Sequence, residues 1–237
     1  MKKGVLILKV GEALPGIRER RGDFEDWIGR GLGGGLPVRV ADGRREALPD
    51  PAEYAGVVVT GSRENVTDGT AWMIRAAQWL SGAVRQEVPL LGICFGHQIL
   101  AYALGGEVGP NPAGRNFGTV SFRSAAGAAG DPLFRGFPDS FPAQASHAQR
   151  VLRLPPGAVL LASADADPHA AFRAGSRVWG VQFHPEFDAG ITADYVDAYR
   201  KELAAGGLDP DRLISGVRET PEAAAILRRF AEVAAAG

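Results

Sequence analysis

Residues 89–100 read Pro-Leu-Leu-Gly-Ile-Cys-Phe-Gly-His-Gln-Ile-Leu. Pro89–Ile93 has the continuous apolar character of a buried strand, and a helix is expected to follow at once over Phe95–Leu104. Two glycines flank Cys94 in a Gly-x-nucleophile-x-Gly pattern, a nucleophile elbow with sulfur in place of hydroxyl. Such a turn strains its central residue and needs neighbours without side chains, so that backbone segments can approach closely. The stretch therefore predicts a strand-turn-helix unit that presents a thiol.

The chain before this stretch alternates strands and helices. Strands are indicated at Val5–Val10, Val38–Ala41 and Tyr54–Thr60, and helices at Asp23–Leu32 and Gly69–Arg85. Asp68 has the right chemistry to cap the second helix. Strand, helix, strand, helix with short connections is typical of a doubly wound, mostly parallel sheet, so we expect a flavodoxin-like α/β fold.

The pattern changes after Gly105. Four β-like segments are separated by Pro- and Gly-rich turns, at Thr119–Phe122, Val159–Ala162, Ala170–Arg173 and Val178–Phe183. We expect them to be antiparallel strands added at an edge of the sheet. Helices follow near the C-terminus: Tyr195, Tyr199 and Leu203 are spaced four apart, and Thr220 and Pro221 make a good helix start. The apolar stripe after Pro221 favours core packing over a partner site.

Composition excludes several classes of protein. A length of 237 residues suits one large domain, which we expect over residues 1–237. With 26 basic and 27 acidic residues, no overall field attracts nucleic acid or an anionic membrane. No stretch approaches the ~20 apolar residues of a membrane helix, and the run Val5–Leu8 is too short for a signal peptide. A single cysteine forms no intramolecular disulfide, so the reducing cytoplasm fits best.

Cys94 combines the features of a reactive thiol. At a helix N-terminus, unpaired N–H groups and the helix dipole favour the thiolate. The N–H of Phe95 would point to the place where a tetrahedral oxyanion forms. The alternative is a buried structural cysteine, which is the commoner role of a lone cysteine. The two glycines at a strand-helix junction favour the reactive role.

A second motif, Val-Trp-Gly-Val-Gln-Phe-His-Pro-Glu-Phe, occupies residues 178–187. On a strand, His184 and Glu186 would point to the same side, and Pro185 between them indicates a strand end or an edge. An imidazole can take the proton of a thiol and return it to a leaving amine, while a carboxylate holds the imidazole in place. A His-x-Glu pair alone could equally be a surface ion pair. Together with the elbow it predicts a cysteine-dependent amidase.

Both motifs resemble the signatures of class I glutamine amidotransferases, Gly-Ile-Cys-Phe-Gly-His-Gln around Cys94 and the segment that contains His-Pro-Glu. The order of the motifs matches as well, and the chain is most similar to stand-alone, GMP-synthase-like members. The resemblance implies that Cys94 attacks the γ-amide carbon of glutamine and forms a thioester. It also implies that His184 acts as base and then acid, with Glu186 behind it, and that the amides of Gly61 and Phe95 form the oxyanion hole.

The resemblance also implies where substrate binds. Gln98 matches a position that contacts bound glutamine, and the segment Ser146, His147 and Ala148 matches one whose backbone holds the α-amino and α-carboxylate groups. No cofactor is implied, and the four histidines and one cysteine show no metal-ligand spacing. Two features depart from the family. The segment Thr60–Arg63 replaces a Gly-Gly-Pro loop. His97, for which we favour a packing or polar-surface role, stands where many relatives have a smaller or apolar residue.

Three functions remain open at this point. The first is hydrolysis of glutamine to glutamate and ammonia, with a separate synthetase subunit as the acceptor of ammonia, because the chain carries no nucleotide-binding glycine motif. The second is a γ-glutamyl peptidase acting on glutathione-like conjugates, which would need an open pocket beyond the scissile bond. The third is a catalytically silent regulatory or binding subunit. Intact Cys94, His184 and Glu186 argue against the third.

Overall fold

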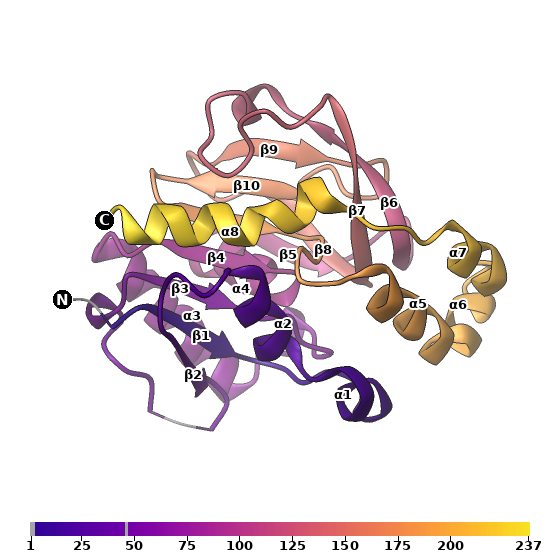
Figure 1. Ribbon diagram of the computed structural model, residues 1–237, viewed down its shortest axis with the longest axis horizontal. Helices are drawn as coiled ribbons and strands as arrows, with labels where there is room; N and C mark the ends of the chain where they lie inside the picture. The colour runs from indigo at the N-terminus through magenta and orange to yellow at the C-terminus, as the bar shows by residue number, and fades with distance from the viewer. Residues whose placement is uncertain (1–2, 46) are drawn as a thin grey trace.

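The computed structural model describes residues 3–45 and 47–237, and its largest element is a nine-stranded sheet (Figure 1). Five parallel neighbours come first in spatial order: β2 (Val38–Asp42), β1 (Val5–Lys9), β3 (Gly56–Val59), β4 (Leu90–Ile93) and β11 (Val178–Val181). Four antiparallel strands continue the sheet: β10 (Ala171–Ala174), β9 (Val159–Ser163), β6 (Asn116–Ser124) and β7 (Ser140–His147). A separate antiparallel pair joins β5 (Glu107–Pro110) to β8 (Gln149–Arg153).

The central strands are apolar on both faces because helices cover both faces. In β1, Val5 and Ile7 belong to one core cluster, whereas Leu6 and Leu8 belong to the other. The first cluster includes side chains of α2 (Phe24–Gly31) and α8 (Pro221–Ala235), and the second those of α3 (Ala71–Arg85) and α4 (Phe95–Ala103). Two covered faces explain why these strands read as continuous apolar runs rather than alternating ones.

Short helices occupy one end of the molecule. These are α1 (Pro15–Arg21), α5 (Ala189–Ala198), α6 (Arg200–Ala205) and α7 (Pro210–Gly216), and the last three lie together at the right of the view (Figure 1). Three 3₁₀ turns complete the elements: Pro51–Glu53, Val66–Asp68 and Ala126–Ala128. A small apolar cluster of Phe117, Val196 and Leu203 connects the helices to β6. Within the described ranges, no helix has both the length and the apolar character to cross a membrane.

The α/β fold expected from the sequence is confirmed. The parallel strands follow the flavodoxin-like order, and the antiparallel strands extend one edge. The expectation for Val178–Phe183 was wrong in one respect, because β11 pairs in parallel with β4 and only its other neighbour, β10, is antiparallel. It is therefore an interior strand of the parallel part, and this places the chain that follows β11 at the carboxyl edge of the sheet.

The helix starts expected at Asp68 and at Thr220–Pro221 had different outcomes. Asp68 does not cap α3, because Gly69 has a left-handed φ of 58° that separates Asp68 from the helix, and the Asp68 carboxylate instead accepts from the amide of Asn65 at 3.1 Å. In contrast, α8 begins at Pro221 as expected, and Phe230 on its apolar stripe is fully buried in the core. Core packing is thus confirmed for that stripe.

Candidate active site

The predicted site residues come together where parallel strands end. Gly61 follows β3, Cys94 follows β4 and His184 follows β11, and these three strands are neighbours in the sheet. The carboxyl edge of an open α/β sheet is where such folds bind ligands, because the loops that leave neighbouring parallel strands meet there. The topology therefore brings together segments that lie far apart in the sequence.

Cys94 has the strained backbone expected of an elbow. Its φ of 52° and ψ of −103° are rare for a residue with a side chain. A Cβ at Gly96 would lie 2.4 Å from the carbonyl oxygen of Val59, and one at Gly92 would lie 2.3 Å from that of Gly96. Both flanking positions therefore need glycine. The thiol is buried but lines a cavity at the strand ends.

His184 and Glu186 form a close pair, though not on a strand. β11 ends at Val181, so the strand end expected near Pro185 is confirmed, but His184 and Glu186 lie in the turn that follows and a strand does not align them. Pro185 explains the difference, since it offers no N–H to a neighbouring strand. The Nδ1 of His184 nevertheless donates to Glu186 Oε1 at 2.7 Å. The amide of His184 also donates to the carbonyl of Gln144 at 2.9 Å, which ties the turn to β7.

The surroundings of His184 favour the protonated form of its imidazole. Burial lowers its pKa, but the carboxylate of Glu186 and the sulfur of Cys94 act more strongly in the other direction and raise the pKa of His184 to about 10. The ring also stacks on Phe187, with centroids 4.0 Å apart. At neutral pH this arrangement supplies a proton next to the sulfur, as the departure of an amine from a thiol adduct requires.

The two candidate oxyanion donors lie on either side of the site. Gly61 lies two residues after the end of β3, and a Cβ there would lie 3.2 Å from His184 Cε1, so its backbone passes beside the imidazole. Phe95 is the first residue of α4, where an amide has no partner within the helix. Within residues 3–45 and 47–237, neither amide donates to a protein acceptor. Both are available to a developing negative charge.

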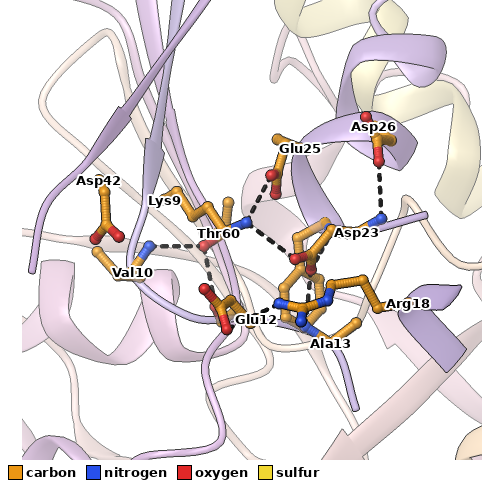
Figure 2. A network of polar contacts seen from close by, with 12 residues as sticks. Lys9, Val10, Glu12, Ala13, Arg18, Asp23, Glu25, Asp26, Asp42 and Thr60 are labelled. Atoms are coloured by element: carbon orange, nitrogen blue, oxygen red, sulfur yellow. Dashed lines mark hydrogen bonds and ion pairs between the residues drawn. The ribbon is translucent and has the colours of Figure 1, made fainter. Parts of the chain in front are cut away.

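A network of polar contacts fixes one wall of the site (Figure 2). The carboxylate of Asp23 accepts from the amides of Ala13 and Phe24 at 2.7 and 2.8 Å and from Lys9 Nζ at 2.9 Å. Lys9 also donates to Glu25 at 2.6 Å. The ring of Phe24 in turn lies parallel to that of His184, with centroids 6.3 Å apart. The network thereby places an aromatic side chain beside the imidazole.

The residues expected to bind substrate surround a cavity of about 250 Å³ next to the sulfur. Gln98 lies in the cavity wall, and its amide nitrogen donates to the carbonyl of Gln149 at 2.8 Å and to Gln182 Oε1 at 3.1 Å. Both of its donors are thus occupied, whereas its oxygen accepts no hydrogen bond from the residues that the structure describes. The carbonyl oxygen of Ser146, at the end of β7, lies 3.9 Å from Cys94 Sγ. Ala148 completes this side of the cavity.

His147 has a second feature that its sequence context did not indicate. Its Nε2 lies 2.7 Å from the carboxylate of Asp167, which also accepts from Asn116 at 2.9 Å. Burial raises the pKa of Asp167, but the hydrogen bond and charge of His147 lower it more, so the net shift is downward. Asp167 stands in a run of small and turn-forming residues, where no motif marks it. The pair holds the ring of His147 in the cavity wall.

His97 does not contribute to the cavity. Its ring packs 5.1 Å from that of Phe172, and a Cβ at Gly180 would lie 2.6 Å from its Nδ1. Complete burial lowers the pKa of His97 to about 3, so the ring is neutral. These contacts agree with a packing role. Among the described residues, no cluster of three His, Cys, Asp or Glu side chains could hold a metal ion.

Several cavity residues lie outside the predicted motifs. They come from α2, β6, β8, loops, and α5 with the residue that follows it: Phe24, Ser62, Arg63, Glu64, Asn65, Arg115, Phe117, Gln149, Tyr195 and Tyr199. The spacing of Tyr195 and Tyr199 marked a helix face but not its neighbour in space. Ser62, Arg63, Glu64 and Asn65 follow the end of β3, and that position in a parallel sheet could have suggested them.

The sequence has recognisable relatives. The model of the family described as glutamine amidotransferase class-I matches residues 37–196. A glutamine-hydrolyzing GMP synthase of Aeropyrum pernix is 38% identical over 151 residues, which are 64% of this chain and 27% of that protein. Gamma-glutamyl peptidase 3 of Arabidopsis thaliana is 31% identical over 165 residues, 67% of this chain and 65% of that protein. The chain thus spans about a quarter of the GMP synthase, at 27%, and about two thirds of the peptidase, at 65%.

Solved structures show the same fold. A glutamine amidotransferase from Thermotoga maritima superposes with a TM-score of 0.78 over 100% of both chains, at 24% identity. A second glutamine amidotransferase, from Methylobacillus flagellatus, gives a TM-score of 0.75 over 99% of this chain and 94% of the other, at 26% identity. The likeness extends to residues beyond 37–196, so the helices at the C-terminal end belong to the shared architecture.

Proposed function

The chain belongs to the class I glutamine amidotransferase family, and on this premise we propose that it hydrolyses the γ-amide of glutamine through a thioester on Cys94. The observation that carries the proposal is the meeting of Cys94, on a strained elbow, with the His184–Glu186 pair at a cavity. A thiol, a base and a carboxylate that orients the base are the parts that nucleophilic amide hydrolysis needs.

The reaction has two halves. The sulfur of Cys94 attacks the γ-carbonyl carbon, and the amides of Gly61 and Phe95 stabilise the oxyanion. The intermediate collapses as the C–N bond breaks, and His184 gives its proton to the departing ammonia. Water then attacks the thioester while His184 takes a proton from it, and glutamate leaves. Glu186 keeps the imidazole oriented in both halves.

The substrate's amino-acid end is assigned to the opposite side of the cavity. The backbone of Ser146, His147 and Ala148 offers groups for the α-amino and α-carboxylate, and the Gln98 oxygen offers an acceptor. We place the enzyme in the cytoplasm, because a thiol nucleophile works only while it is reduced. We also propose that a synthetase consumes the ammonia, because a glutamine-hydrolyzing GMP synthase is among the relatives that match this chain.

Glutamate release tests the proposal directly. The purified chain is offered glutamine, with the Cys94→Ala protein as control, and the adduct formed by a glutamine-analogue electrophile is located by mass spectrometry. We expect glutamate from the unsubstituted chain only, and a covalent adduct on Cys94. Equal glutamate release by the Cys94→Ala protein would contradict the nucleophile assignment.

A γ-glutamyl peptidase is the second candidate. One observation favours it: the match to gamma-glutamyl peptidase 3 covers 65% of that protein. The chemistry on Cys94 is the same, and only the leaving group changes. Parallel assays with glutamine and with γ-glutamyl peptides separate the two candidates.

A further inference from the structure

An aromatic wall leads away from the catalytic imidazole. We define it as Phe187, Tyr195 and Tyr199, all of which line the cavity. The ring of His184 lies 4.0 Å from that of Phe187, which lies 5.0 Å from Tyr195, and Tyr195 lies 6.5 Å from Tyr199. Because His184 protonates the leaving group, that group departs on the His184 side. The aromatic wall therefore borders the path of the leaving group.

Two arginines stand at the far end of the aromatic wall. The guanidinium of Arg115 lies 5.9 Å from the ring centroid of Tyr199. Arg63 approaches the same tyrosine: burial raises the pKa of Tyr199, and the charges of Arg63 and Arg115 oppose that rise. Both arginines line the cavity, although they come from different segments, the loop after β3 and the turn before β6.

Neither arginine has a protein partner for its charge. Among the residues that the structure describes, Arg63 and Arg115 take part in no ion pair and no side-chain hydrogen bond. The one carboxylate in the cavity lining, that of Glu64, accepts from the indole of Trp72 at 3.3 Å. The indole is neutral, so Glu64 keeps its negative charge, but it forms no ion pair with either arginine among the described residues. The described lining therefore carries two guanidinium groups against one carboxylate, and its excess of positive charge suits an anion.

We propose that Arg63 and Arg115 form a subsite for a carboxylate on the leaving group, so that the enzyme takes γ-glutamyl amides of amino acids or peptides. The proposal rests on the thioester chemistry proposed above for the same site. The bond from sulfur to the γ-carbon forms, the C–N bond breaks, and the amine leaves with the proton of His184. Guanidinium groups suit this role because they donate two parallel hydrogen bonds to a carboxylate.

A matched pair of ligands tests the subsite by binding alone. γ-Glutamylglycine carries a carboxylate on its leaving group, and γ-glutamylglycinamide replaces that group with a neutral amide. Calorimetry with the Cys94→Ala protein measures the affinity for each without turnover. We expect the carboxylate compound to bind about tenfold more tightly, the size of one charge-assisted hydrogen bond at a solvated site. The double variant Arg63→Gln/Arg115→Gln should reduce this ratio to about one.

The control variant is Arg39→Gln/Arg85→Gln, which removes the same charge from two exposed arginines that lie outside the cavity lining. It should keep the preference for the carboxylate compound. A ratio near one in the unsubstituted background would overturn the subsite. An equal loss of affinity for both ligands in the double variant would also overturn it, because the arginines would then hold the glutamyl end.

Glutamine turnover by the chain with Cys94 intact distinguishes failure of the carboxylate subsite from failure of the proposed function. Turnover of glutamine without a carboxylate preference overturns the subsite and keeps the proposed function. A carboxylate preference in binding without any turnover supports the subsite and contradicts the proposed hydrolysis.

Discussion

The hydroxyl of Thr60 donates a 3.0 Å hydrogen bond to the carbonyl of Gly61 and accepts one of 3.0 Å from the amide of Val10 (Figure 2 shows the contact with Val10). Thr60 is fully buried, so water does not compete for these bonds. A Cβ at Gly11 would lie 2.5 Å from the Gly61 carbonyl oxygen, which shows how closely the ends of β1 and β3 approach. One side chain therefore joins the two strand ends behind the candidate oxyanion donor.

Replacing Thr60 with valine should therefore affect catalysis and stability together. Thr60→Val keeps the shape but leaves the Val10 amide and the Gly61 carbonyl unpaired, at a cost of about 1–3 kcal/mol in unfolding free energy. With Gly61 less firmly held, kcat for glutamine should fall by about tenfold or more while KM changes little, because the oxyanion exists only in the transition state. Thr60→Ser keeps the hydroxyl and should retain most of kcat. An equal loss in both variants would contradict this role.

The raised pKa of His184 predicts a pH dependence of stability. The pKa rises from 6.5 to about 10 in the folded chain, so the fold favours the imidazolium. This contribution is fully present below the unfolded pKa of 6.5 and disappears as pH rises through about 10. Glu186→Gln removes a main cause of the shift. The difference in unfolding free energy between the unsubstituted chain and Glu186→Gln should thus be largest near pH 6.5 and decrease toward pH values of about 10. Urea unfolding measured across this range checks the sign, and a constant difference would contradict the assignment.

The strain at Cys94 predicts an order of stability between two inactive variants. Glycine adopts a positive φ without the steric cost that alanine meets. Cys94→Gly should therefore be more stable than Cys94→Ala by about 1 kcal/mol, after the larger chain entropy of glycine is deducted from the strain that it relieves. Chemical unfolding of both proteins measures the difference. If Cys94→Ala were clearly the more stable, the elbow would not be strained.

Local patterns in the sequence were sufficient for four of the five parallel strands, β1 to β4. The runs Val5–Val10 and Pro89–Ile93 are strands because both faces of the sheet are covered, and that condition shows directly in composition. The pairing of Val178–Val181 with β4 could not be foreseen, since a short apolar run looks alike in parallel and antiparallel positions. Partner choice between strands depends on tertiary packing.

The residues of the candidate site also fall into those that the sequence could predict and those that it could not. Cys94, His184 and Glu186 stand in motifs whose spacing reflects backbone geometry, so their roles could be proposed from sequence. Thr60 and Arg115 have no such context. Thr60 contacts Val10 across the ends of β3 and β1, and Arg115, before β6, contacts Tyr199, the residue that follows α5. Only the folded chain brings those segments together.

The position of the Phe24 ring beside His184 depends on Asp23, and this yields a final prediction. Asp23 caps α2 and pairs with Lys9, and its side chain is 5% exposed (Figure 2). Asp23→Asn removes the buried charge beside Lys9 and weakens the cap, so the unfolding free energy should fall by about 2–4 kcal/mol. Because Phe24 is the first residue of α2, its ring should also lose its fixed position beside His184, and kcat/KM for glutamine should fall at temperatures well below unfolding.

Glu25→Gln is the matched control, because Glu25 pairs with the same lysine at 2.6 Å but its side chain is 21% exposed and does not cap the helix. More of its Coulomb energy is already screened by solvent, so this change should cost about 1 kcal/mol or less and leave kcat/KM nearly unchanged. Urea unfolding and glutamate release are measured on both variants at the same pH. Equal losses of stability and of kcat/KM in the two variants would mean that the ion pair with Lys9, rather than the cap formed by Asp23, positions Phe24.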